Sequence, residues 1–149
     1  MAHEPAMLIS NPLNESPLTF PILECFHLAG MALLVGTVAI GDFRVFGWGM
    51  RRQGVTELAK SLAPWTLVGL VLVLLSGPMM FSSDPDMYYL NWVFVSKMVI
   101  LALAITFNYT IRRKTLKSGS SPARAKVVAG ISLALWVLVI GGGIFIAFV

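Results

Sequence analysis

Four long apolar stretches constrain the fold of this chain more than any other feature of its sequence. They cover residues 21–46, 61–81, 89–111 and 127–149, and each is close to the ~20 residues with which an α-helix crosses a bilayer. The stretches are continuous rather than alternating, which excludes the strands of a membrane β-barrel. Because a helix satisfies its backbone hydrogen bonds within one segment, the sequence predicts an all-α bundle of four transmembrane helices.

The composition agrees with a chain embedded in a membrane. Of the 149 residues, 57% are hydrophobic and 12% are charged, whereas about a quarter of the residues in a soluble domain are charged. The length allows one bundle, so we expect a single transmembrane domain over residues 1–149 that contacts the lipid bilayer. Residues 1–20 are rich in turn-forming residues and are expected to lie along the outer surface.

Basic residues gather in two of the three connections between the apolar stretches. The first connection carries Arg51, Arg52 and Lys60, and the third carries six bases between residues 112 and 126. The second connection, SSDPDMYYLN, and the segment before the first stretch contain acidic residues but no Lys or Arg. The positive-inside rule therefore predicts that both termini lie on the outer, periplasmic side. The net charge of +4 reports topology, so we expect no nucleic-acid partner.

Unusual residues occur at one depth in all four apolar stretches. His27 lies about 9 Å below the start of the first stretch, at a rise of ~1.5 Å per residue, and Lys97 has a similar depth in the third. Gly77 and the glycines at 141–143 lie near the outer ends of the second and fourth stretches. An ionisable group at the bilayer centre costs about 2.5–3.5 kcal/mol, so such groups normally face the bundle interior.

Helical spacing places these residues on two stripes that we expect to face inward. The stripe of the first stretch comprises Glu24, His27, Met31, Leu34, Val38 and Asp42, and that of the third comprises Lys97, Leu101, Ala104 and Asn108. The sequence thus predicts a pocket with one imidazole, one amine, thioethers and flat glycine walls. A haem suits such a pocket, with His27 as its metal ligand. The other residues predicted around the cofactor are Lys97, Glu24, Met31, Gly77 and Gly142.

Three segments carry a resemblance to known families: ECFHLAGMALLVGTVAIGDFR, APWTLVGLVLVLLSGPMMF and NWVFVSKMVILALAITFNY. They resemble a family of uncharacterised bacterial four-helix membrane proteins. They are more distantly similar to CopD-type copper-resistance membrane domains and to HemJ-type membrane protoporphyrinogen oxidases. The HemJ resemblance implies haem b, a histidine in the first helix and a lysine in a later one, which His27 and Lys97 match in kind. Asn108 stands where such families would place a further histidine.

These observations predict a haem b protein of the bacterial inner membrane that acts in electron transfer. It would be a small or accessory subunit of a larger membrane redox complex, or would form a homo-oligomer, and no catalytic residue is identified. One alternative is a copper-handling protein, because thioether and thiolate ligands suit copper(I). Its ligands would be drawn from His27, Cys25, Met31, Met79 and Met80. The other alternative is a structural or assembly subunit without a cofactor.

Each residue of the predicted pocket also has a simpler explanation. His27 could hydrogen-bond a neighbouring helix, and the glycines could serve close helix packing. Lys97 could extend to the outer surface or pair with Glu24 across the bundle. The methionines could be packing residues, and Gly77 with the proline that follows it could mark a kink. The agreement in depth, rather than any one residue, favours the functional interpretation.

Overall fold

The computed structural model describes residues 16–49, 52–83, 85, 88 and 91–146. The described elements are helical: α1 (Thr19–Phe46), α2 (Val55–Ser83), α4 (Trp92–Phe107), the π-helical turn η2 (Asn108–Arg112), α5 (Arg113–Lys117) and α6 (Pro122–Phe145). α4, η2 and α5 follow one another without a break, and we call them together the third rod. Within the described residues, four helical stretches are long and apolar enough to cross a membrane, which confirms the predicted all-helical, multi-pass fold.

Capping residues set where two of the helices begin. The side chain of Asn91 accepts hydrogen bonds from the backbone N–H groups of Val93 and Phe94 at the start of α4. Ser121 accepts one from the Arg124 N–H, and Pro122 is the first residue of α6. α2 begins at Val55, six residues before the apolar stretch at 61–81, and runs through both of its prolines. Residues 1–15 and 147–149, which the predicted surface segment and last span include, lie outside the described residues.

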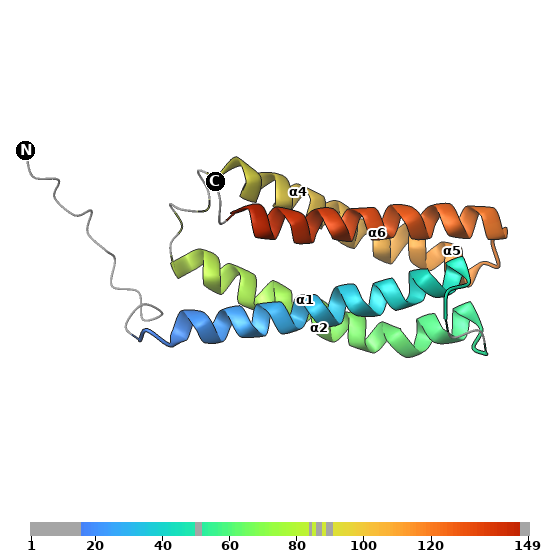
Figure 1. Ribbon diagram of the computed structural model, residues 1–149, viewed down its shortest axis with the longest axis horizontal. Coiled ribbons are helices and arrows are strands. Elements are labelled where there is room, and N and C mark those ends of the chain that lie inside the picture. The colour runs from blue at the N-terminus through green and yellow to red at the C-terminus, as the bar shows by residue number, and fades with distance from the viewer. Residues whose placement is uncertain (1–15, 50–51, 84, 86–87, 89–90, 147–149) are drawn as a thin grey trace, which may run out of the picture.

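The bundle consists of two helical hairpins. α1 packs along α2, α4 packs along α6, and contacts between α1 and α6 join the two pairs. Figure 1 shows α1 and α2 below α4 and α6, with the first turns of α1 and α4 at the same end of the molecule as the last turns of α2 and α6. α2 and α4 make little direct contact. The seam between the two hairpins on this side therefore has room for cavities.

Two glycines bring α1 and α2 into close contact. A Cβ atom on Gly69 would lie 2.5 Å from the backbone N of Leu34, and one on Gly30 would lie 2.8 Å from the Cβ of Leu72. A side chain at either position would push the backbones apart, so glycine permits the approach. One helical turn or so further along, the Thr37 and Thr66 hydroxyls hydrogen-bond across the same interface at 2.8 Å.

The buried apolar cluster lies where α1, α2, α4 and α6 meet, and it includes Trp136, which is 1% exposed. Its other members are Leu34, Val38, Leu70, Val73, Leu101, Ala104 and Val139. Many large apolar side chains point away from it and are more than half exposed, among them Leu28, Leu67, Leu75, Leu103, Val137 and Phe145. An outer surface of this kind is typical of lipid-facing helices and not of a soluble monomer.

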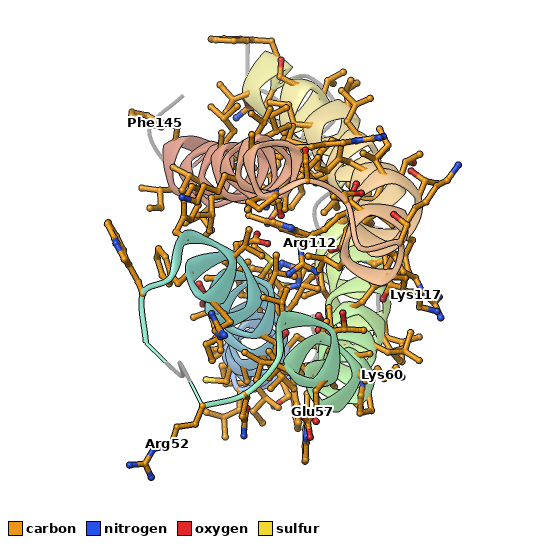
Figure 2. All side chains as sticks on the ribbon, turned by 90° about the vertical axis from the view of Figure 1, so that its right-hand side faces the viewer. Arg52, Glu57, Lys60, Arg112, Lys117 and Phe145 are labelled. Carbon is orange, nitrogen blue, oxygen red and sulfur yellow. The ribbon has the colours of Figure 1, made fainter. Side chains whose placement is uncertain are left out.

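A buried ion pair ties α1 to the π-helical turn. Arg112 Nε donates to Asp42 Oδ1 at 2.8 Å, with 1% of the Asp42 side chain and 12% of the Arg112 side chain exposed. Arg112 also donates to the Val38 carbonyl oxygen and to the Asn108 side chain, and Figure 2 shows its side chain in the middle of the bundle. Among the described residues no other ion pair is present. The sequence predicts Asp42 on the inward stripe, as found, whereas for Arg112 it indicates only a place at the basic end of the bundle.

Candidate functional site

A cavity of about 380 Å³ lies between the two hairpins at the end where α1 begins. It is bounded by α1, α2, α4 and α6, and two of the three ionisable residues predicted around the cofactor, His27 and Lys97, line it. His27 and Lys97 are half-buried. The coincidence of depth in the sequence therefore corresponds to a common location in space, which we call the His27 cavity.

A chain of two hydrogen bonds fixes the imidazole of His27. The Ser76 hydroxyl donates to the Leu72 carbonyl oxygen at 2.6 Å, one turn earlier in α2. Its oxygen lies 2.9 Å from Nδ1 of His27. A hydroxyl has one hydrogen, so with that hydrogen committed to Leu72 it accepts from His27, and Nδ1 carries a proton. The neutral ring then has its lone pair on Nε2, for which the described residues offer no hydrogen-bond partner.

Glycines make room for both ionisable side chains. A Cβ atom on Gly77 would lie 3.5 Å from Cε1 of His27, so the ring rests against the bare backbone of α2. A Cβ on Gly142 would lie 3.1 Å from Cβ of Lys97, and one on Gly143 would lie 3.2 Å from its Nζ. The Lys97 side chain thus extends along the glycines of α6. Of the predicted glycines, Gly77 lines the cavity, whereas Gly142 does not and instead gives room to the Lys97 side chain.

The structure separates the remaining predicted residues into two groups. Met31 lines the His27 cavity with His27, Lys97 and Gly77. Glu24 is exposed, does not line the cavity and forms no ion pair with Lys97.

The five candidate copper ligands are divided in the same way. Met80 lies in the cavity wall with His27 and Met31. Cys25 is exposed as a free thiol, and Met79 is 42% exposed. Met79 is not among the residues that line the cavity, whereas Met80 is. Among the described residues there is no cluster of three or more His, Cys, Asp or Glu side chains that could hold a metal ion.

An aromatic wall, which the sequence analysis missed, closes the cavity on the side of α2 and α4. The rings of Phe81 and Phe94 stack with centroids 5.6 Å apart, and Tyr88 packs against both at 6.0 and 5.4 Å. All three line the cavity. The sequence signal was present, because Phe81 and Phe94 flank the second connection, but nothing in their spacing showed that they meet.

Fold and site define a membrane-spanning four-helix protein with a cavity between its helices that one imidazole and one amine line. The chain belongs to a family of unknown function, DUF6644, whose match covers residues 19–149. No curated protein and no solved structure matches it. Membership agrees with the predicted uncharacterised family, and no link to the CopD or HemJ types is found.

Proposed function

We propose that this protein binds a b-type haem in the His27 cavity, with His27 as the axial ligand, and that it transfers electrons within the membrane. The observation that carries the proposal is the hydrogen bond between Nδ1 of His27 and the Ser76 hydroxyl. It leaves Nε2, the usual ligand atom, unprotonated and without a protein partner. Metal-binding histidines nearly always donate their other ring N–H to a neighbouring acceptor, commonly a carboxylate, a backbone carbonyl or a water, and the Ser76 oxygen takes that place here.

The cavity fits a planar apolar cofactor by its lining and size. Its volume of about 380 Å³ lies within the roughly 300–1,000 Å³ range of cofactor and ligand sites. The bare backbone at Gly77 offers a flat surface beside the imidazole, and the stacked pair Phe81 and Phe94 offers another apolar surface.

The protein's own residues would set the properties of the site. A bound haem supplies one-electron chemistry, and its potential depends on axial ligand, burial and nearby charge. Ser76 holds the imidazole in one orientation, and Lys97 supplies a positive charge or a lone pair at the same cavity. Lys97, Met31 and Met80 are the residues available as a second axial ligand, since bis-histidine ligation within the chain is excluded by its single intramembrane histidine.

We infer that the basic end of the bundle faces the cytoplasm of a bacterial cell, with both termini outside, and that the His27 cavity lies in the outer half of the inner membrane. The charge asymmetry of the connections supports this orientation. The exposed apolar helix surfaces offer area for other subunits of a redox complex or for a second copy of the chain.

Copper(I) is the second candidate for the cavity. His27, Met31 and Met80 share its wall, and one imidazole with two thioethers is a donor set that suits copper(I). The exposed thiol of Cys25 is outside this set.

An absorption spectrum of the purified protein, with metal analysis of the same sample, tests the proposal. We expect a Soret band and a reduced α-band, both largely lost in His27→Ala. The matched control is Cys25→Ser, which changes an exposed residue two positions away on α1 and should keep the pigment. A colourless protein that contains copper would favour the second candidate. A colourless, metal-free protein that does not take up added haemin, or a pigment retained in His27→Ala, would contradict haem ligation.

A further inference from the structure

A second cavity, also of about 380 Å³, opens at the opposite, basic end of the seam between the hairpins. Its walls are the first half of α2 on one side and η2 with α5 on the other. The Thr56 hydroxyl donates to the Leu116 carbonyl oxygen at 3.0 Å and joins α2 to α5 at this cavity. This second cavity takes no part in the proposed haem site, and we call it the basic cavity.

The basic cavity is lined by four cationic side chains and by no acidic one. Arg112 is committed to Asp42 by the buried ion pair. Lys60, Arg113 and Lys117 are exposed and form no ion pair or hydrogen bond with other described residues. Figure 2 shows Lys60 of α2 and Lys117 of α5 on the same side of the bundle, with Glu57 pointing elsewhere. Three uncompensated positive charges thus surround one opening.

Below these charges one wall of the cavity is apolar, whereas four polar side chains line another part of it: Thr37, Thr66, Asn108 and Tyr109. The apolar wall consists mainly of small and aliphatic side chains of α2, with Leu116 of α5 opposite: Ala59, Leu62, Ala63, Pro64 and Leu67. Leu67 is 52% exposed and so faces the membrane. Cations at the end of the bundle with an apolar groove leading toward the membrane core match the two halves of a phospholipid, an anionic headgroup at the surface and acyl chains below it.

We propose that the basic cavity is a binding site for an anionic phospholipid, whose phosphate is held by Lys60, Arg113 and Lys117 and whose acyl chain lies against Ala63 and Leu67. Basic pockets between transmembrane helices are known places for anionic headgroups, and a Lys or Arg near such a surface contributes about 1 kcal/mol of attraction. The lipid bridges α2 and the third rod, which make little direct contact elsewhere.

Lipid-binding measurements on the full chain in neutral detergent test this proposal, with phosphatidylglycerol and phosphatidylcholine of identical acyl chains. Native mass spectrometry or a fluorescent-lipid titration reports the affinity for each. We expect the natural protein to prefer phosphatidylglycerol. In the triple variant Lys60→Gln, Arg113→Gln, Lys117→Gln this preference should fall about five-fold for each charge removed. The control triple, Lys114→Gln, Arg124→Gln, Lys126→Gln, removes the same charge from exposed positions at the same end that do not line the cavity, and should keep the preference.

If both triple variants lose the preference for phosphatidylglycerol equally, the whole basic end attracts the lipid and the proposal is overturned. The proposal is also overturned if neither triple variant loses the preference. If the triple variant of the cavity-lining residues does not fold, a variant that leaves every charge in place tests the proposal instead. Ala63→Trp fills the groove, and we expect it to weaken phosphatidylglycerol binding, whereas Ala102→Trp, on the exposed side of α4, should not. Unchanged binding in Ala63→Trp overturns the proposal. Inorganic phosphate is the last probe: if millimolar phosphate displaces the lipid, the site recognises free phosphate and the lipid assignment is wrong.

Discussion

The Ser76 hydroxyl of α2 lies 2.9 Å from Nδ1 of His27 on α1, and its own hydrogen is directed to the Leu72 carbonyl oxygen. This pair of bonds gives the imidazole one tautomer and one orientation, with Nε2 left for the cavity. A hydrogen bond between neighbouring helices and a ligand-binding histidine are therefore compatible roles of the same residue.

Ser76→Ala tests the role of this contact. The variant should lose the interhelical bond at a cost of about 0.6 kcal/mol in the free energy of unfolding, the average for such bonds in membranes. If His27 ligates haem, the midpoint potential or spectrum should also shift, because the ring loses its outer partner. Ser76→Thr, which keeps the hydroxyl, should behave like the natural protein in redox titration. A pigmented Ser76→Ala protein with unchanged potential and spectrum would remove Ser76 from the site.

Lys97→Met should change the spectrum or the midpoint potential while leaving helix content and membrane insertion intact, because Lys97 lines the His27 cavity. Glu24→Gln is the matched control. Glu24 is exposed and unpaired with Lys97, so we expect it to change neither the spectrum nor the stability. Destabilisation by Lys97→Met that Glu24→Gln relieves in the double variant would instead reveal a pair between the two.

Breaking the buried ion pair should destabilise the bundle strongly. Asp42→Asn or Arg112→Gln alone leaves a buried partner uncompensated, and we expect each to lower the free energy of unfolding by about 3–5 kcal/mol. The double variant should recover a large part of this loss. Arg124→Gln, an exposed charge in the first turn of α6, should have little effect. Additive losses in the double-mutant cycle, measured by unfolding in detergent, would contradict coupling between the two side chains.

Gly69→Ala should destabilise the α1–α2 hairpin. The new methyl group would meet the backbone N and Cα of Leu34 at 2.5 and 2.9 Å, and backbone atoms cannot move aside as a side chain does. We expect a loss of about 1–3 kcal/mol, as for other overpacked sites. Gly36→Ala in α1, where no atom lies within 4 Å of the added Cβ, should be neutral. Thermal unfolding compares the two, and equal stability would argue against close approach at Gly69.

The orientation can be checked with single cysteines introduced into a Cys25→Ser background. A membrane-impermeant maleimide added to intact cells should label Ser16→Cys and should leave Ser120→Cys unlabelled until the cells are lysed. This pattern follows from the excess of bases in the first and third connections. Labelling of Ser120→Cys from outside would move the His27 cavity to the inner half of the membrane.

The sequence by itself determined the four apolar helices, because each helix satisfies its own backbone in lipid and needs only length and composition to be recognised. Periodicity also determined which face turns inward over most of two stripes: Leu34, Val38 and Asp42 on α1, and Leu101, Ala104 and Asn108 on the third rod, are all buried. Depth along each helix then brought His27 and Lys97 to one level, and the structure places both at one cavity.

Only the tertiary structure decided which side chains meet. Helical spacing gives direction and depth but no neighbour, so it could not pair Ser76 with His27 or Arg112 with Asp42, which lie 49 and 70 residues apart. Helical spacing also placed Glu24 on the same inward stripe as His27, although Glu24 is exposed and His27 is half-buried. α1 and α2 approach closely at Gly30 and Gly69, whereas α2 and α4 make little contact and leave a seam between the hairpins. Both cavities lie along this open seam, and helix packing, which depends on residues far apart in the chain, placed them there.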